Sequence, residues 1–182
     1  MKQISFKKLV SAHADVQREL RKVGLSGSKL DAVEVFHCNW PQLTMPLALG
    51  FFIHRDFGIG KMIGYRQGHI YIPRWVFSSG HCALRDIIRH EYAHALVYHY
   101  RDAVMTAAFP RTFKKSSHGN SDGFITPYAA KCPEEDFAET FMVFVRRVGK
   151  PLPPRRNEEI RRKYQFVGEV IDHVSRSELV RK

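Results

Sequence analysis

The sequence is dominated by one stretch, Arg89-His90-Glu91-Tyr92-Ala93-His94-Ala95-Leu96. Apolar residues in and around this stretch recur at helical spacing, which predicts a buried amphipathic helix containing Leu84, Ile87, Ile88, Ala95 and Leu96. Residues four apart share one face of a helix, so the imidazoles of His90 and His94 can reach a single ion. Glu91 is turned about a quarter of a circle away, toward whatever else that ion binds.

This H-E-x-x-H spacing supports a specific chemistry. Imidazole nitrogens are common ligands of Zn²⁺, and a nearby carboxylate can act as general base toward the water that the ion activates. The pattern therefore predicts His90 and His94 as metal ligands and Glu91 as the catalytic base. The alternative is a pair of structural histidines in the core with a surface glutamate between them.

A third protein ligand is needed, because two histidines hold zinc poorly and a catalytic site keeps its fourth position open to water. His99 lies five positions past His94, which turns it off the shared helix face. Glu135 and Glu139 could act together, one as the ligand and the other as the acid that holds a ligating histidine through its second ring nitrogen. The full set of candidates is Glu135, Glu134, Glu139, His118, His99 and Asp122.

A second helix is predicted to begin at Pro133. Proline fits the first helical position, and acids in the first turn interact favourably with the helix dipole. The predicted buried stripe of this helix consists of Phe137, Phe141, Phe144, Val145 and Val148. Glu135 and Glu139 lie close to that stripe, and acids near a buried face need a partner.

A small antiparallel sheet is predicted ahead of the central helix. Residues 47–53, 61–65 and 69–77 are rich in β-branched and aromatic side chains and are separated by glycines. The strand at 68–73 carries a proline near its end, which is tolerated at an edge of the sheet or at a strand terminus. As an edge strand beside the catalytic helix, it could pair with an extended peptide by strand addition. The fold class expected is α+β.

The size of the chain favours one domain. Its 182 residues include 44% hydrophobic ones, which is enough to fill a core. We expect a single domain over 1–182, made of an N-terminal helical accessory segment (1–45), a catalytic core (46–148) and a C-terminal helix (155–182). The apolar stripe of that last helix is predicted to pack on the body rather than form a dimer seam, so we expect a monomer.

The net charge of +11 comes from 29 basic against 18 acidic residues. Such a bias can attract nucleic acid, an anionic membrane surface or acidic peptides. The basic residues are scattered or lie on predicted helix faces, which we interpret as solvated. They include Arg18, Arg21, Lys22, Arg161, Arg162 and Lys163. A protein or peptide substrate is therefore favoured over nucleic acid.

Cysteine usage and the absence of export signals favour a reducing compartment. Three cysteines, Cys38, Cys82 and Cys132, are an odd number without framework spacing. The N-terminus lacks the apolar core of a signal peptide, and the longest apolar run, 45–53, is too short to span a bilayer. We expect a cytoplasmic protein without a membrane span, although an effector exported without a leader would look the same. Cys38 is interpreted as a core residue rather than a group that blocks a zinc site.

The combination of the two motifs resembles a known family. His90-Glu91-Tyr92-Ala93-His94 followed by Glu135-Asp136-Phe137-Ala138-Glu139 resembles the gluzincin zinc metallopeptidases, whose second motif is a glutamate ligand with another acid four residues on. Thr126-Pro127-Tyr128 ahead of that motif is similar to the protease domain of anthrax lethal factor and related zinc peptidases. The resemblance covers about residues 83–144.

The resemblance implies a zincin-like fold and a Zn²⁺ cofactor. It implies His90, His94 and Glu135 as the zinc ligands, with Glu91 as the base. Tyr128 would supply the hydroxyl that stabilises the oxyanion, with His118 as second choice, and Glu139 would hold a ligating histidine. The sequence departs from the family pattern where Pro133 and Glu134 precede the ligand, which leaves Glu134 as a fallback ligand.

Two other functions are considered. Ser117-His118-Gly119 resembles the third-ligand region of SprT-like proteases that act on DNA-associated proteins, and the positive charge suits DNA. That function leaves Glu135 and Glu139 without a role. A catalytically inactive interaction module with the same fold would have no need of Glu91 beside the two histidines.

Overall fold

The computed structural model describes most of the chain as a mixed α+β structure that is mostly helical. The residues described are 2–38, 50–53, 66–73, 75–76, 84–113, 123–153 and 157–180. The helices are α1 (Phe6–Lys22), α3 (Leu84–His99), α4 (Arg101–Val104), α5 (Phe109–Thr112), α6 (Pro133–Arg146) and α7 (Glu158–Val180), with 3-10 turns η1 (Lys29–Ala32) and η2 (Tyr128–Lys131). The strands are β1 (Lys2–Gln3), β2 (Val35–Cys38), β3 (Phe51–Phe52), β4 (Ile70–Pro73) and β5 (Trp75–Val76).

The main sheet is mixed, so the prediction of an antiparallel sheet is wrong for one of its two pairings. The strand order is β2-β4-β3, with β2 parallel to β4 and β3 antiparallel to it. Strands β1 and β5 form a separate antiparallel pair. Parallel pairing arises because β2 and β4 are joined by a long crossover rather than by a hairpin. The predicted strand at 61–65 lies outside the described residues.

Strand β4 is central in this sheet, so of the two predicted positions for its proline the edge strand is wrong and the strand terminus is confirmed. Ile70, Tyr71 and Ile72 are buried, as expected for a strand with neighbours on both sides. Pro73 is the last residue of the strand, where its missing N–H removes little from the ladder. Among the described strands of this sheet, β2 and β3 occupy the two edges.

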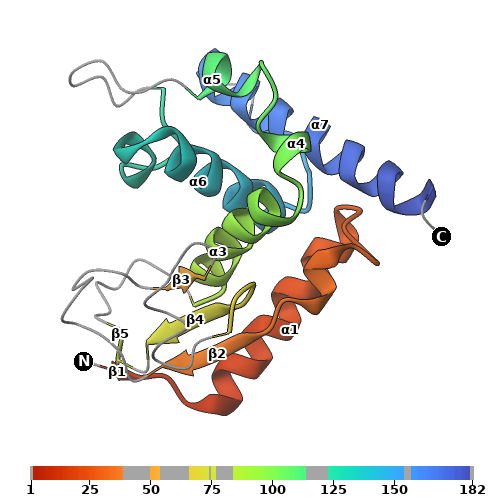
Figure 1. Ribbon diagram of the computed structural model, residues 1–182. Coiled ribbons are helices and arrows are strands. Elements are labelled where there is room, and N and C mark those ends of the chain that lie inside the picture. The colour runs from red at the N-terminus through yellow and green to blue at the C-terminus, as the bar shows by residue number, and fades with distance from the viewer. Residues whose placement is uncertain are drawn as a thin grey trace.

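Helix α3 lies between the sheet and helix α6 (Figure 1). Buried residues of α1, β4, α3, α6 and α7 belong to one apolar cluster, which includes Val16, Ile70, Leu96, Phe141 and Val167. The two predicted central helices are confirmed within the described residues, and α6 begins at Pro133 as expected. The central helix therefore has one face on the sheet and α1 and another on α6.

Buried polar contacts fix α3 between its neighbours. The guanidinium of Arg89 donates to both carboxylate oxygens of Glu19 on α1, at 2.7 and 2.8 Å, and also contacts Asp86. Arg146 of α6 reaches the other oxygen of Asp86 at 3.1 Å. Two hydrogen bonds from one guanidinium set orientation as well as distance. These contacts hold α3 in a fixed position relative to α1 and α6.

Helix α7 packs on the body of the chain, as predicted. The side chain of Asn157 caps it by accepting from the Glu159 N–H at 2.7 Å. Its apolar stripe is buried within the single chain and consists of Ile160, Tyr164, Val167, Ile171 and Val174. None of the helices in the described part of the chain is long and apolar enough to cross a membrane.

One residue of α7 contradicts the sequence analysis. Lys163, predicted to lie on a solvated helix face, is only 1% exposed. It lies one turn from both Ile160 and Val167, so it belongs to the buried stripe. The charge is tolerated there because Asp136 of α6 pairs with it at 2.8 Å.

Candidate metal centre

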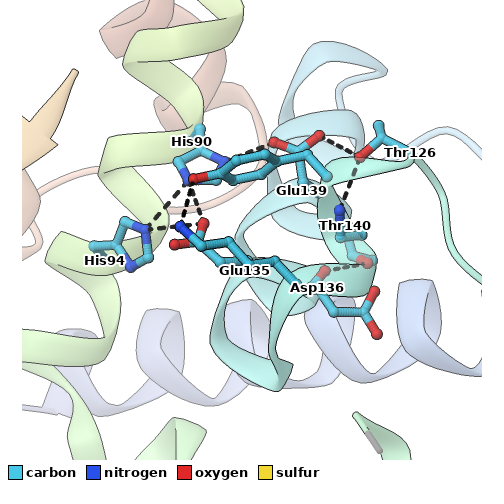
Figure 2. A network of polar contacts seen from close by, with 10 residues as sticks. His90, His94, Thr126, Glu135, Asp136, Glu139 and Thr140 are labelled. Carbon is cyan, nitrogen blue, oxygen red and sulfur yellow. Dashed lines mark hydrogen bonds and ion pairs between the residues drawn. The ribbon is translucent and has the colours of Figure 1, made fainter. Parts of the chain in front are cut away.

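Four side chains from two helices converge on one small region. Figure 2 shows His90 and His94 of α3 facing Glu135 and Glu139 of α6. The histidines share a face because they are four apart on α3, and the acids share a face of α6 for the same reason. Among the described residues, His90, His94 and Glu135 form the one group that could hold a metal ion, with their ligand atoms all within 4.8 Å of one another.

The distances within this group suit a tetrahedral ion. His90 Nε2 lies 3.2 Å from His94 Nε2 and 3.0 Å from Glu135 Oε2, and His94 Nε2 lies 3.8 Å from the same oxygen. Zinc–ligand bonds of about 2.0–2.2 Å at tetrahedral angles separate ligand atoms by about 3.3–3.6 Å. The three atoms need only small adjustments to bind one ion.

The ligand oxygen of Glu135 is short of hydrogen-bond donors. Glu135 Oε2 is buried, and its 3.0 Å contact with His90 is an ion-pair contact rather than a well-directed hydrogen bond. Buried polar atoms in native proteins are normally paired. An oxygen left in this state beside two imidazole nitrogens fits a cation better than it fits the protein alone.

Glu139 holds His90 through the other nitrogen of the ring. Its Oε1 lies 2.7 Å from His90 Nδ1, and its Oε2 accepts from the hydroxyl of Thr126 at 2.7 Å. Thr126 in turn accepts from the backbone N–H of Ala129 at 3.3 Å. A carboxylate on Nδ1 fixes the ring and leaves Nε2 for a metal. Sequence analysis proposed Glu139 for this place but gave Thr126 no role.

His90 and Glu135 shift each other's pKa. Burial would lower the pKa of His90, but its interactions with Glu135 and Glu139 raise that pKa to about 10. Burial would likewise raise the pKa of Glu135, but the interaction with His90 and the charges of His90 and His94 hold it below its usual range. The positive charge of a protonated His90 is therefore favoured by the two acids that contact its ring nitrogens.

Glu91, the predicted base, is almost entirely buried beside this group. It is 6% exposed, and burial raises its pKa to about 7, while the charge of His90 and a backbone hydrogen bond from Phe52 act in the opposite direction. A carboxylate that titrates near neutrality can both take and return a proton at ordinary pH. Phe52 lies on β3, so the sheet edge contacts the base directly.

The approach of β3 to α3 requires a glycine. A Cβ added at Gly50 would lie 2.8 Å from Ile87 Cγ2, 2.9 Å from Ile72 Cδ1 and 3.3 Å from Glu91 Cγ. The first two distances are shorter than real Cβ contacts, so a larger residue would push the strand away from the helix. Gly50 thereby lets the strand that carries Phe52 reach Glu91.

Tyr128 lies beside His90 and is half exposed. The two rings meet edge to face with centroids 5.8 Å apart, and the side chain of Tyr128 is 50% exposed. Lys131, three residues on, donates to the Tyr128 hydroxyl at 3.4 Å. Burial and the charge of Glu135 raise the pKa of Tyr128, and Lys131 opposes them. A protonated hydroxyl at the open side of the group can act as a hydrogen-bond donor.

The remaining candidates do not join the group. Glu134 is exposed, and His99 is not part of it. His118 and Asp122 lie outside the described residues. Comparisons of the chain with protein-family models, with curated proteins and with solved structures found no match.

Proposed function

We propose that this chain is a zinc-dependent endopeptidase of the gluzincin type with a zincin-like fold. The observation that carries the proposal is the convergence of the His90, His94 and Glu135 ligand atoms next to a buried Glu91. Two imidazoles and one carboxylate are a ligand set used by catalytic zinc, and three protein ligands leave one position for water or substrate.

Each residue has a role that follows from its position. Bound zinc would supply an acidified water and polarise the carbonyl of a peptide bond. Glu91 takes the proton from the attacking water and returns it to the leaving amine. Tyr128, at the exposed side of His90, donates to the oxyanion, and Glu139 keeps His90 oriented.

A SprT-like function is less well supported. It needs a third histidine as ligand, whereas the contacts among the described residues favour Glu135 for that role beside His90 and His94. An inactive interaction module is also less well supported, because burying Glu91 is costly and serves no purpose without proton transfer.

The experiment that tests the proposal compares wild type with Glu91→Gln. Metal content is measured by mass spectrometry on purified protein, and peptidase activity on a peptide library. We expect zinc in both proteins and a kcat lower by about 10²- to 10⁴-fold in the variant, because an amide cannot accept the proton. Glu134→Gln is the matched control, since Glu134 is an exposed acid of α6 outside the group.

Two results would count against the proposal. Wild-type protein that carries no zinc after purification and takes up none from solution would reject the metal centre. Peptide hydrolysis by Glu91→Gln at the wild-type rate would keep the metal and reject the base.

A further inference from the structure

The C-terminal helix contributes a buried cation close to the metal centre. Lys163 Nζ lies 2.8 Å from Asp136 Oδ2, and the side chains are 1% and 0% exposed. The same ammonium donates to the backbone carbonyl of Gly123 at 2.7 Å and lies 4.4 Å from the centroid of the Phe124 ring. Figure 2 shows Asp136 pointing away from the histidines, on the other side of α6 from Glu135.

The carbonyl that Lys163 binds begins the segment that crosses the metal centre. Residues 123–128 run from this ammonium to Thr126, whose hydroxyl bonds to Glu139, and to Tyr128, whose ring contacts His90. The segment is therefore fixed at one end by α7 and at the other by α6. The anchor at Gly123 is buried among charged groups, whereas the anchor at Thr126 and Tyr128 contacts Glu139 and His90.

Gly123 is closely enclosed at the first anchor. A Cβ added there would lie 2.5 Å from Glu159 Oε2, while the other oxygen of Glu159 lies 3.4 Å from Lys163 Nζ. The backbone at Gly123 is thus held between the ammonium and the carboxylate of two residues one turn apart on α7. Small shifts of α7 at this point would move the start of the segment.

Stability alone gives little reason for charges at this position. An apolar pair of similar volume is often as stable as a buried ion pair, because taking both charges out of water is costly. A buried ammonium does fix the distance to each acceptor it binds, and here one acceptor is a backbone carbonyl of the crossing segment. The contacts therefore favour a role in placement.

We propose that Lys163 is a positioning residue that holds residues 123–128 across the metal centre, so that Thr126 stays on Glu139 and Tyr128 stays beside His90. This inference rests on the proposed function for the role of Tyr128, but its effect on the ligand group is independent of peptide hydrolysis. Lys163 acts through Thr126 and Glu139, because its ammonium contacts Asp136, Glu159, Gly123 and Phe124 rather than the ligand group.

The test is a double-mutant cycle on zinc affinity. One variant is Lys163→Met with Asp136→Leu, which replaces the ion pair by an apolar pair and leaves no unpaired buried charge. The other is Thr126→Val, which removes the hydroxyl from Glu139 and keeps the shape of the side chain. Zinc affinity is measured by competition with a chelator, and backbone hydrogen exchange is followed over residues 123–131.

We expect each change to weaken zinc binding by up to about tenfold, since each acts on the ligand group only through Glu139, the acid that holds His90. The combined variant should bind zinc no more weakly than Thr126→Val alone, because both changes break the same connection between Lys163 and Glu139. Exchange over 123–131 should rise by about tenfold in the ion-pair variant, while exchange in α3 stays unchanged. A folded ion-pair variant with wild-type zinc affinity and wild-type exchange would overturn the inference. Losses of zinc affinity that multiply in the combined variant would also overturn it.

Tyr164→Phe is the matched control. Its hydroxyl also donates from α7 to a backbone carbonyl at 2.7 Å, but the carbonyl is that of Lys150, away from the crossing segment. This variant should lose some stability and keep wild-type zinc affinity. Equal losses of zinc affinity in the control would show that any loosening of α7 disturbs the site, which would contradict a specific role for Lys163.

Failure of the peptidase proposal is distinguishable from failure of this inference. If wild type binds zinc but cleaves no peptide, the zinc cycle and hydrogen exchange still decide the role of Lys163. If the apolar pair does not fold, Lys163→Arg replaces it, because arginine keeps a cation beside Asp136 but cannot place a single ammonium against Gly123. Lys163→Arg with wild-type zinc affinity and wild-type exchange over 123–131 would reject the inference.

Discussion

Two successive acids on α6, Glu135 and Asp136, have partners of different chemistry. Glu135 faces the two histidines of α3, at 3.0 Å from His90 and 3.8 Å from His94. Asp136, on the other side of the helix, faces Lys163 at 2.8 Å. Both carboxylates are largely removed from water, so each depends on its partner to remain charged.

The difference between these partners determines what each side can do. A neutral imidazole nitrogen carries a lone pair, so a histidine can exchange its proton for a metal ion. A lysine ammonium offers only donors and no lone pair, so it cannot bind a metal ion. The Glu135 side therefore includes groups that could hold a metal ion, whereas the Asp136 side pairs with a cation. Mutation of Glu135 should therefore mainly change zinc affinity, and mutation of Asp136 should mainly change the stability of the fold.

The largest difference is expected between Glu135→Ala and Asp136→Asn. Glu135→Ala removes one of three ligands, so zinc affinity should fall by more than the roughly 100-fold seen when outer partners are lost. Asp136→Asn removes the buried counter-charge of Lys163 and leaves only the partly exposed Glu159 beside it, which should cost up to about 3–5 kcal/mol of unfolding free energy. Zinc titration and thermal unfolding of both variants measure the two effects.

The same pair of measurements can break the comparison. Zinc affinity that falls more in Asp136→Asn than in Glu135→Ala would mean that the acids have exchanged roles. Glu134 cannot take the place of Glu135 in this experiment, because it points about 100° around the helix from it.

A smaller loss is expected for Glu139→Ala. Glu139 touches His90 Nδ1 rather than an ion, and the loss of such a partner typically weakens metal affinity by about 10–100-fold. The variant should therefore still load at saturating zinc, as measured in the same titration. Weaker binding by Glu139→Ala than by Glu135→Ala would assign the ligand to Glu139 instead.

Local signals in the sequence were sufficient to predict this region. Helical spacing placed His90 and His94 on one face, and Pro133 with its following acids marked the start of α6. The meeting of the two helices is a tertiary contact that spacing does not determine. It was anticipated because two histidines require a third ligand, and the resemblance to the gluzincin pattern pointed to Glu135 among several candidates.

Features that depend on distant contacts were missed. The parallel pairing of β2 with β4 joins strands of four residues each, which are too short for their sequences to specify neighbours. Lys163 was grouped with its exposed neighbours in the sequence, although its spacing from Ile160 and Val167 placed it on the buried stripe. Thr126 gave no signal, because its role depends on a loop that returns to α6.

The smallest expected effect concerns His13 of α1, which contacts Tyr92 of α3 rather than the metal centre. His13 of α1 lies 2.7 Å from the hydroxyl of Tyr92, and burial lowers its pKa from 6.5, although the Val33 carbonyl and Glu34 oppose the shift. With a folded pKa below the unfolded value of 6.5, neutral His13 contributes stability that is complete above about pH 6.5 and is lost as the pH falls through the folded pKa. At His13 the charge of Glu34 does not offset burial, whereas at His90 the interactions with Glu135 and Glu139 outweigh it. We expect His13→Gln to reduce the acid sensitivity of unfolding below pH 6.5, measured in the presence of chelator so that zinc release does not contribute.

His173→Gln, at an exposed position of α7, is the control and should keep the wild-type slope. An unchanged slope in His13→Gln would mean that burial does not shift the pKa of this imidazole. The conclusion that the partner of a buried group determines its charge would then apply to the acids of α6 alone.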